Sequence, residues 1–386
     1  MTEWIECTLD KLGEIVGGAT PSTKCEDYYG GSIPWITPKD LSSFKGRYIT
    51  SGERNITEKG LASCSAQMMP KDAVLFTSRA PIGYVAIASQ SVCTNQGFKS
   101  IVVNEKADPL FVYYLLKYNK DAIEAMGSGT TFKEVSGKTM RAVKVRIPLD
   151  VSYQKRIAAV LDSLDTKIEN NERINDNLQQ QAAALFSSLY DRSNTEVRFT
   201  DLIQILGGGT PKTGENTYWN GNIAFFTPKD VGTPYTLITE KTISKEGLSH
   251  CNSRLYPVNT VFVTARGTVG KVGMSGVPMA MNQSCYALVG KETHQLLVYF
   301  YTLKAVDRLK HKASGAVFDA ITTRDFESEQ IMKLSDDDAT AFLRVAEPMF
   351  QEVLNNNIEI LRLSTLRDSL LPKLMSGEID VSAVQL

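Results

Sequence analysis

The sequence contains two copies of one long pattern, and this duplication constrains the fold more than any other feature. The motif GGATP at 17–21 recurs as GGGTP at 207–211, and TPKD at 37–40 recurs at 227–230, both 190 positions later. Around these motifs 13 of 28 positions are identical, which chance does not produce. A period this long exceeds that of a solenoid repeat, so the sequence predicts a duplicated domain.

Each copy has the same internal order. Short β-type runs such as 73–77, 85–88 and 258–264 are separated by turn residues, and helical periodicity follows at 111–120 and 296–311. Each copy then closes with a long helical stretch. We therefore expect an α+β protein with mixed α/β domains at 1–150 and 196–335 and helical regions at 151–195 and 336–386.

The two long helical stretches carry their core residues at alternating spacings of four and three, the pattern of a coiled coil. About 35 residues of helix make a rod on the order of 50 Å long. The positions expected to pair the helices are Ile157, Leu161, Leu164, Ile168, Asn171, Leu178 and Leu185 in the first stretch, and Phe342, Met349, Val353, Asn356, Ile360, Leu363 and Leu370 in the second.

Asn171 and Asn356 occupy equivalent core positions near the middle of these stretches. An apolar core disfavours Asn unless its amide finds a partner. We expect the helices to pair antiparallel about a pseudo-twofold axis, with Asn171 near Asn356 setting the register. The alternative is a locally exposed seam. Antiparallel pairing would place the two domains at opposite ends of the rod.

Two similar but non-identical domains at the ends of a stiff spacer would suit a DNA target with two half-sites. Half-sites one helical turn apart are separated by roughly 34–36 Å on one face of the duplex. The net charge is −1, but 1–150 carries +2 and 196–333 carries +3, which permits DNA binding by both domains. The pattern favours a bipartite, asymmetric target with an unread spacer.

Several further motifs stand in a distinctive order. They are IPWITPKD at 33–40, TSR at 77–79 with Gly83, NQGF at 95–98 and the tail LLPKLMSGEI at 370–379. With the two GGxTP motifs, they make the chain resemble, over essentially its whole length, the specificity subunit of a type I restriction-modification system. The second copy departs from the pattern, with IAFF at 223–226 and Cys285 in place of Phe98.

The resemblance implies two target-recognition domains that alternate with two helical conserved regions and bind double-stranded DNA. It implies recruitment of two methyltransferase subunits, which use S-adenosylmethionine to methylate adenine N6 in each half-site. Restriction subunits, with translocase and nuclease activity, can then join and use ATP. The specificity subunit itself would carry out no chemistry. The alternatives are a standalone DNA-binding regulator and a protein-binding scaffold.

The sequence offers no signal for catalysis, a metal or a membrane. It has no Pro-Pro pair, which an amino-methyltransferase motif needs, and no GxxxxGK[ST] phosphate loop. The six cysteines form no C-x-x-C pair and the three histidines are scattered, so no metal site is expected. Without a signal peptide or a run of ~18 apolar residues, we expect a cytoplasmic protein.

Residues shared by the two copies are candidates for positioning DNA, and residues that differ are candidates for reading it. Arginine and lysine bind phosphate, arginine also reads guanine, and paired amides read adenine. The alternatives are turn chemistry, ion pairs and loop hydrogen bonds. The shared candidates are Lys39, Lys229, Arg79, Arg266, Asn95, Gln96, Asn282 and Gln283. The further candidates are Lys24, Arg47, Tyr84, Lys99, Lys212 and Lys271.

A last group of apolar residues lies off the predicted helix seam, where it would pack on partner proteins or within the chain. These residues are Val160, Ala183, Phe186, Leu366 and Leu371.

Overall fold

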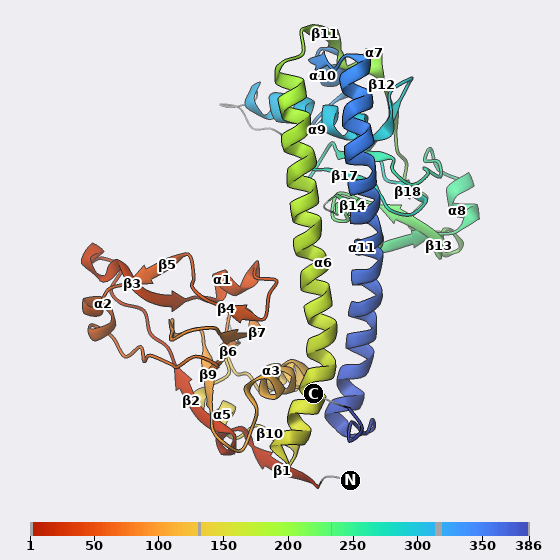
Figure 1. Ribbon diagram of the computed structural model, residues 1–386. Helices are drawn as coiled ribbons and strands as arrows, with labels where there is room; N and C mark the ends of the chain where they lie inside the picture. The colour runs from red at the N-terminus through yellow and green to blue at the C-terminus, as the bar shows by residue number, and fades with distance from the viewer. Residues whose placement is uncertain (1–2, 130–132, 233, 313–318, 385–386) are drawn as a thin grey trace. The chain divides into compact units, whose positions relative to one another are not determined.

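The computed structural model of the chain describes residues 3–129, 133–232, 234–312 and 319–384. Two compact units are formed (Figure 1): unit 1 is Met1–Glu169 with Arg362–Leu386, and unit 2 is Asn170–Leu361. Each unit holds one α/β domain and parts of two long helices, α6 (Val151–Asp191) and α11 (Asp336–Ser376). Among the described helices, none is long and apolar enough to cross a membrane.

The described residues of unit 1 form three sheets. The largest has the order β2 (Gly13–Gly17), β9 (Lys99–Val103), β6 (Val74–Ser78), β7 (Ile82–Ala88) and β4 (Tyr48–Ile49). The others have the orders β5 (Arg54–Ile56), β3 (Tyr29–Ile36), β8 (Cys93–Thr94), and β1 (Trp4–Thr8), β10 (Lys144–Pro148). Its helices before α6 are η1 (Leu9–Lys11), η2 (Glu26–Tyr28), α1 (Pro38–Ser42), α2 (Glu58–Ala62), α3 (Pro109–Tyr118), α4 (Lys120–Ala125) and α5 (Gly137–Arg141).

In unit 2, the part of the chain that the structure describes likewise forms three sheets. The largest has the order β12 (Ile203–Gly207), β19 (Cys285–Gly290), β16 (Val261–Thr264), β17 (Val272–Ser275) and β14 (Tyr235–Thr236). The others have the orders β15 (Lys241–Ile243), β13 (Trp219–Phe226), β18 (Met279–Met281), and β11 (Thr195–Arg198), β20 (Gln330–Lys333). Its shorter helices are α7 (Phe199–Leu202), η3 (Asn216–Tyr218), α8 (Lys245–Ser249), α9 (Gln295–Lys312) and α10 (Thr323–Glu327).

The two domains have the same topology strand for strand, which confirms the predicted duplication and the mixed α/β class. The order β2-β9-β6-β7-β4 corresponds to β12-β19-β16-β17-β14, and β5-β3-β8 corresponds to β15-β13-β18. Parallel pairing also occurs at equivalent places, between β4 and β7 and between β14 and β17. The β-type runs and helical segments predicted from the sequence fall on β6, β7, β16, α3 and α9.

Local sequence fixes the ends of the long helices. The Asp150 carboxylate accepts a hydrogen bond from the Ser152 backbone at 2.9 Å and begins α6, while the Ser335 hydroxyl accepts one from the Asp338 backbone at 3.1 Å and begins α11. Gly377, with a φ of +79°, ends α11, because a left-handed residue after a helix favours glycine.

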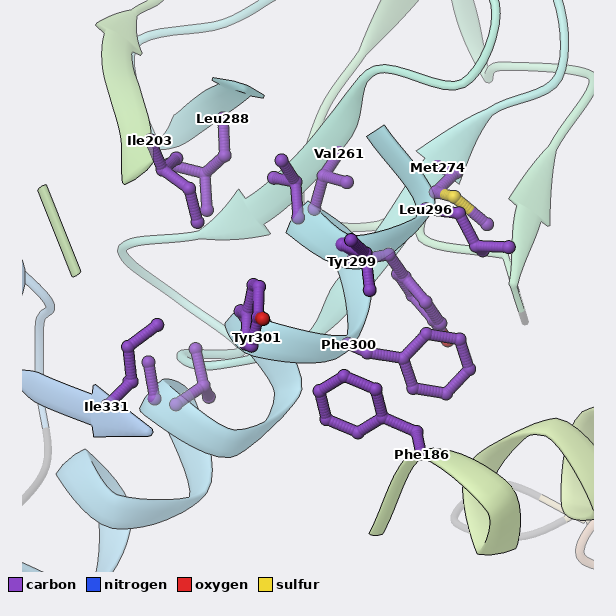
Figure 2. Close-up of a cluster of buried hydrophobic side chains, with 14 of the residues drawn as sticks. Phe186, Ile203, Val261, Met274, Leu288, Leu296, Tyr299, Phe300, Tyr301 and Ile331 are labelled. Carbon is purple, nitrogen blue, oxygen red and sulfur yellow. The ribbon is translucent and has the colours of Figure 1, made fainter. Parts of the chain in front are cut away.

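Both long helices contribute buried residues to each hydrophobic core. In unit 1, Ile157 and Leu161 of α6 and Leu374 of α11 are buried with the apolar face of α3. In unit 2, Phe186 of α6 stacks on Phe300 of α9 with ring centroids 4.9 Å apart (Figure 2). Phe342 of α11 meets Phe300 edge-on at 5.2 Å. Aromatic pairs of this kind add about 0.5–1.5 kcal/mol each beyond the area they bury.

Phe186 therefore packs within the chain and not on a partner protein, which was one of the two alternatives for the residues off the helix seam. Val160 and Leu371 also pack against the core of unit 1, whereas Leu366 and Ala183 are exposed.

Within each unit the two long helices run antiparallel, as predicted. In unit 1, Asp165 of α6 pairs with Arg367 of α11, and Tyr153, earlier in α6, bonds Asp380 beyond the end of α11. In unit 2, Asn171 donates to Glu359 and Asn175 accepts from Asn356, so residues further along α6 meet residues earlier in α11.

The register differs from the prediction by one helical turn. Asn171 does not pair with Asn356: its amide donates to the Glu359 carboxylate at 2.6 Å. Asn356 instead donates to Asn175 at 2.9 Å, and Asn175 donates to Asn357 at the same distance. A heptad pattern identifies core positions but does not decide which of two asparagines, four residues apart, receives the partner.

The predicted seam positions divide into two sets. Ile157, Leu161, Ile168, Asn171, Phe342, Val353 and Asn356 are buried. Leu164, Leu178, Leu185, Met349, Ile360, Leu363 and Leu370 are half-buried. The seam is only partly covered because α6 and α11 also turn residues toward the domains, so the buried stripe departs from a strict heptad.

Candidate nucleic-acid interface

The Thr-Pro-Lys-Asp motif forms the same turn in both domains. Asp40 accepts hydrogen bonds from the Thr37 backbone at 2.7 Å and from the backbone of Glu53 at 2.7 Å, and so ties two loops together. In unit 2 Asp230 does the same with Thr227 and Glu240. The aspartate therefore orders the loop, and the motif presents the preceding lysine to solvent.

Those lysines, Lys39 and Lys229, are exposed to solvent. Each has 78% of its side chain accessible and lies beside one glutamate, Glu53 at 2.7 Å and Glu240 at 3.4 Å. A hydrogen bond to Glu53 raises the pKa of Lys39 above its ordinary value. Exposed ion pairs of this kind are worth little. Both lysines are thus accessible to a phosphate in the same position of each domain.

The Asn-Gln pairs stabilise loops in both domains. The Asn95 side chain accepts from the Gly97 backbone at 2.8 Å, and the Thr20 hydroxyl donates to Gln96. In unit 2, Asn282 accepts from the Ser284 backbone at 3.1 Å, and Thr210 donates to Gln283. These bonds join the Gly-Gly-x-Thr-Pro motif to the Asn-Gln motif, which explains their joint recurrence. The oxygen of each amide is occupied, whereas Gln96 and Gln283 remain exposed.

The two arginines shared by the copies lie at the same backbone position but in different surroundings. Arg79 forms a β-bridge with Glu134, and Arg266 forms the equivalent bridge with Ala320. The Glu134 carboxylate lies 3.6 Å from Arg79 and 3.6 Å from Lys99. Arg266 is exposed, and no carboxylate pairs with it among the described residues. Sequence reasoning did not single out Glu134, although its replacement by Ala320 in the second copy was the available signal.

Arg47 has a structural role instead of the predicted DNA contact. Its side chain is 6% exposed and binds α6: it makes two 3.0 Å hydrogen bonds to Glu169, one of 2.8 Å to Thr166, and an ion pair with Asp162. Burial by itself would lower the pKa of Arg47, but the hydrogen bond to Glu169 and nearby negative charge raise it. With its guanidinium buried against α6, Arg47 is not accessible to DNA.

A second buried network holds unit 1 together beside Arg47. Asp165 of α6 is 5% exposed and accepts from the Tyr114 hydroxyl of α3 and from Arg367 of α11, both at 2.7 Å. Burial, with the negative charge of Asp165, raises the pKa of Tyr114. This network fixes α3, and with it the sheet, on the long helices.

The remaining candidates lie on the domain surfaces. Lys24, Lys212 and Lys271 are exposed. Tyr84 is half-buried and packs beside the sheet core, so only part of its ring is accessible. In the part of the chain that the structure describes, no group of three or more His, Cys, Asp or Glu side chains is arranged to hold a metal ion.

Two similar α/β domains, each presenting cations on matching loops, define a protein with two recognition surfaces. Residues 1–180 and 192–333 match the family described as the type I restriction modification DNA specificity domain. The chain belongs to this family, and the resemblance seen in the motifs is confirmed.

Known relatives agree with this assignment. The type I restriction enzyme MjaIX specificity subunit of Methanocaldococcus jannaschii is 30% identical, over 98% of this chain and 94% of the relative. The HindI specificity subunit of Haemophilus influenzae is 24% identical, over 73% and 80% of the two chains. The crystal structure of a type I restriction-modification S subunit from M. genitalium has the same fold, with a TM-score of 0.65 and 16% identity over 97% and 96% of the chains.

Proposed function

We propose that the chain is the DNA-recognition subunit of a type I restriction-modification complex, in which each α/β domain reads one half of a bipartite, asymmetric target. The observation that carries this proposal is the contrast between the domains. Their topology is the same strand for strand, yet the side chains on equivalent loops differ, as with Glu134 and Ala320. A common frame with different reading residues suits two half-sites of different sequence.

The long helices are proposed to set the spacing between the half-sites and to recruit two methyltransferase subunits. Each is one continuous helix of 41 residues that contributes to both units. Exposed apolar residues remain on them, including Ile174, Val345 and Leu366. Apolar side chains exposed on a helix that already packs through another face suit a protein partner.

The chemistry of the complex is assigned to the partners. We propose that this subunit is not catalytic, that the methyltransferase subunits bind S-adenosylmethionine and methylate adenine, and that restriction subunits use ATP. A cytoplasmic location follows from that role. The absence of a phosphate-binding loop and of an amino-methyltransferase motif from the sequence supports this division of labour.

Methylome sequencing tests the proposal directly. Cells that express this chain with its methyltransferase should carry methyladenine in both halves of one bipartite motif, and a matched strain lacking only this chain should lose it. If the complex assembles but no bipartite motif is methylated, the chain is a protein-binding scaffold. If the purified chain alone binds one DNA sequence tightly, a standalone regulator becomes the better description.

A further inference from the structure

The duplicated domains offer an internal comparison at one loop position. Arg79 directly follows the last residue of β6, and one residue separates Arg266 from the end of β16. Each arginine forms a β-bridge through its backbone, Arg79 with Glu134 in unit 1 and Arg266 with Ala320 in unit 2. The β-bridge is therefore shared by the two domains, whereas the side chains around the two arginines differ.

Those neighbours give the two arginines different electrostatic surroundings. In unit 1, the Glu134 carboxylate forms ion pairs at 3.6 Å with both Arg79 and Lys99, and 17% of the Lys99 side chain is exposed. In unit 2, Ala320 replaces the glutamate, and Tyr286 stands where the repeat aligns Lys99. The three positions carry a net charge of +1 in both domains, because Arg, Lys and Glu sum to the same value as Arg, Tyr and Ala. The difference is that the Arg79 guanidinium has a carboxylate partner, whereas that of Arg266 has none among the described residues.

We propose that the two arginines perform different tasks: Arg79, positioned by Glu134, donates hydrogen bonds to a base edge, whereas Arg266 neutralises a phosphate. This inference rests on the proposed function and names, for each domain, the part of DNA that this loop contacts. Glu134 is a positioning residue, because it acts on DNA only through Arg79 and Lys99.

The chemistry of the two ligands supports this division. A phosphate that approached Arg79 would also approach the carboxylate of Glu134, and like charges repel. A base edge is uncharged and meets no such repulsion. Arginine has five N–H donors, so the contact with Glu134 through one terminal nitrogen leaves others for the O6 and N7 atoms of guanine. Arg266 has no such carboxylate among the described residues, so its full charge is available to displace counterions from a phosphate.

The test uses the assembled complex of the full chain with its methyltransferase subunits. Binding to a duplex that carries the methylated motif is measured from 50 to 200 mM salt, and methylation is measured on duplex pools randomised at each half-site position. Arg266→Ala should lower the salt slope by about one, which makes the loss of affinity over this range about 3.5-fold smaller, with base preference unchanged. Arg79→Ala should leave the slope unchanged and reduce discrimination at one base pair by about 5- to 160-fold.

Reciprocal exchanges of the neighbour test the role of Glu134. Glu134→Ala should free two cations and steepen the salt slope, whereas Ala320→Glu should lower the slope as Arg266→Ala does. Glu105→Ala is the charge-matched control, since Glu105 is exposed and precedes α3, and it should change neither quantity. Should an alanine variant not fold, Arg79→Lys keeps the charge but loses the planar fork, so discrimination should still fall.

The outcomes separate the inference from the function on which it rests. Equal loss of salt slope in Arg79→Ala and Arg266→Ala, with base preference intact in both, would overturn the division of tasks while leaving DNA recognition in place. A wild-type complex without preference for any bipartite target would instead reject the proposed function itself.

Discussion

Replacing Arg47 with alanine should destabilise unit 1 by about 2–3 kcal/mol. Removing one partner from a buried ion pair costs about 3–5 kcal/mol, because the remaining charge is left unpaired. The partners of Arg47 are not fully buried: the side chains of Asp162 and Glu169 are 35% and 29% exposed. Water can therefore solvate them after the substitution, which lowers the expected cost to about 2–3 kcal/mol.

The assay is unfolding of the full chain, followed in each unit by hydrogen exchange. A unit of this size loses about 2–4 °C in Tm for each kcal/mol of stability that is lost. The Tm of unit 1 should therefore fall by about 4–12 °C, while the Tm of unit 2 should change little. Lys45→Ala is the control, because Lys45 is an exposed cation two positions away, and it should change stability by less than about 0.5 kcal/mol. The double variant Arg47→Ala/Glu169→Gln should cost less than the sum of its single substitutions.

A different result would reinstate the DNA contact that the sequence suggested. If Arg47→Ala left the Tm of unit 1 unchanged but lowered the salt slope of DNA binding by about one, Arg47 would act on phosphate. The contacts with α6 would then be incidental to stability.

Three further predictions concern buried polar and titratable groups. Asn175→Leu should cost about 1–3 kcal/mol, since it leaves the Asn356 amide buried without its partner, and the joint Asn175→Leu/Asn356→Leu variant should recover part of this in a double-mutant cycle. Burial raises the pKa of Tyr299 from 10.0 to about 12, so the stability that this group contributes below pH 10 should be lost as the pH rises toward 12. The measurement is the urea midpoint of unfolding as a function of pH, and in Tyr299→Phe the midpoint should fall less over this range. Burial also raises the pKa of the Cys93 thiol to about 12, so a thiol reagent at pH 8 should label it only in unfolded protein; rapid labelling of the native chain would contradict this.

The architecture was predictable because it rests on patterns that repeat along the chain. The offset between the two GGxTP motifs predicted the duplication, and the heptad spacing from Ile157 predicted the long helix α6, which spans Val151–Asp191. The antiparallel direction of the helices in each unit followed from the duplication, because two copies of one surface can pair with each other. The choice between Asn356 and Glu359 as the partner of Asn171 depends on side-chain geometry that spacing does not encode.

The site was less predictable because its interactions join residues far apart in the sequence. Arg47 binds residues 115 to 122 positions away, and nothing near it in the sequence indicates them. From the sequence alone, a single arginine in a basic domain is as consistent with a DNA contact as with a structural ion pair. The role of Glu134 likewise becomes visible only when the β-bridges place it opposite Arg79 and place Ala320 opposite Arg266.

The most direct test of the account is an exchange of single domains followed by methylome sequencing. Residues 1–150 are replaced by the matching domain of a relative with a different known target, and residues 196–335 are replaced in a second variant. Each exchange should change one half of the methylated motif and leave the other half intact, with the two variants affecting opposite halves. If one exchange altered both halves, or neither exchange altered the motif, the domains would not be independent readers and the central claim would be wrong.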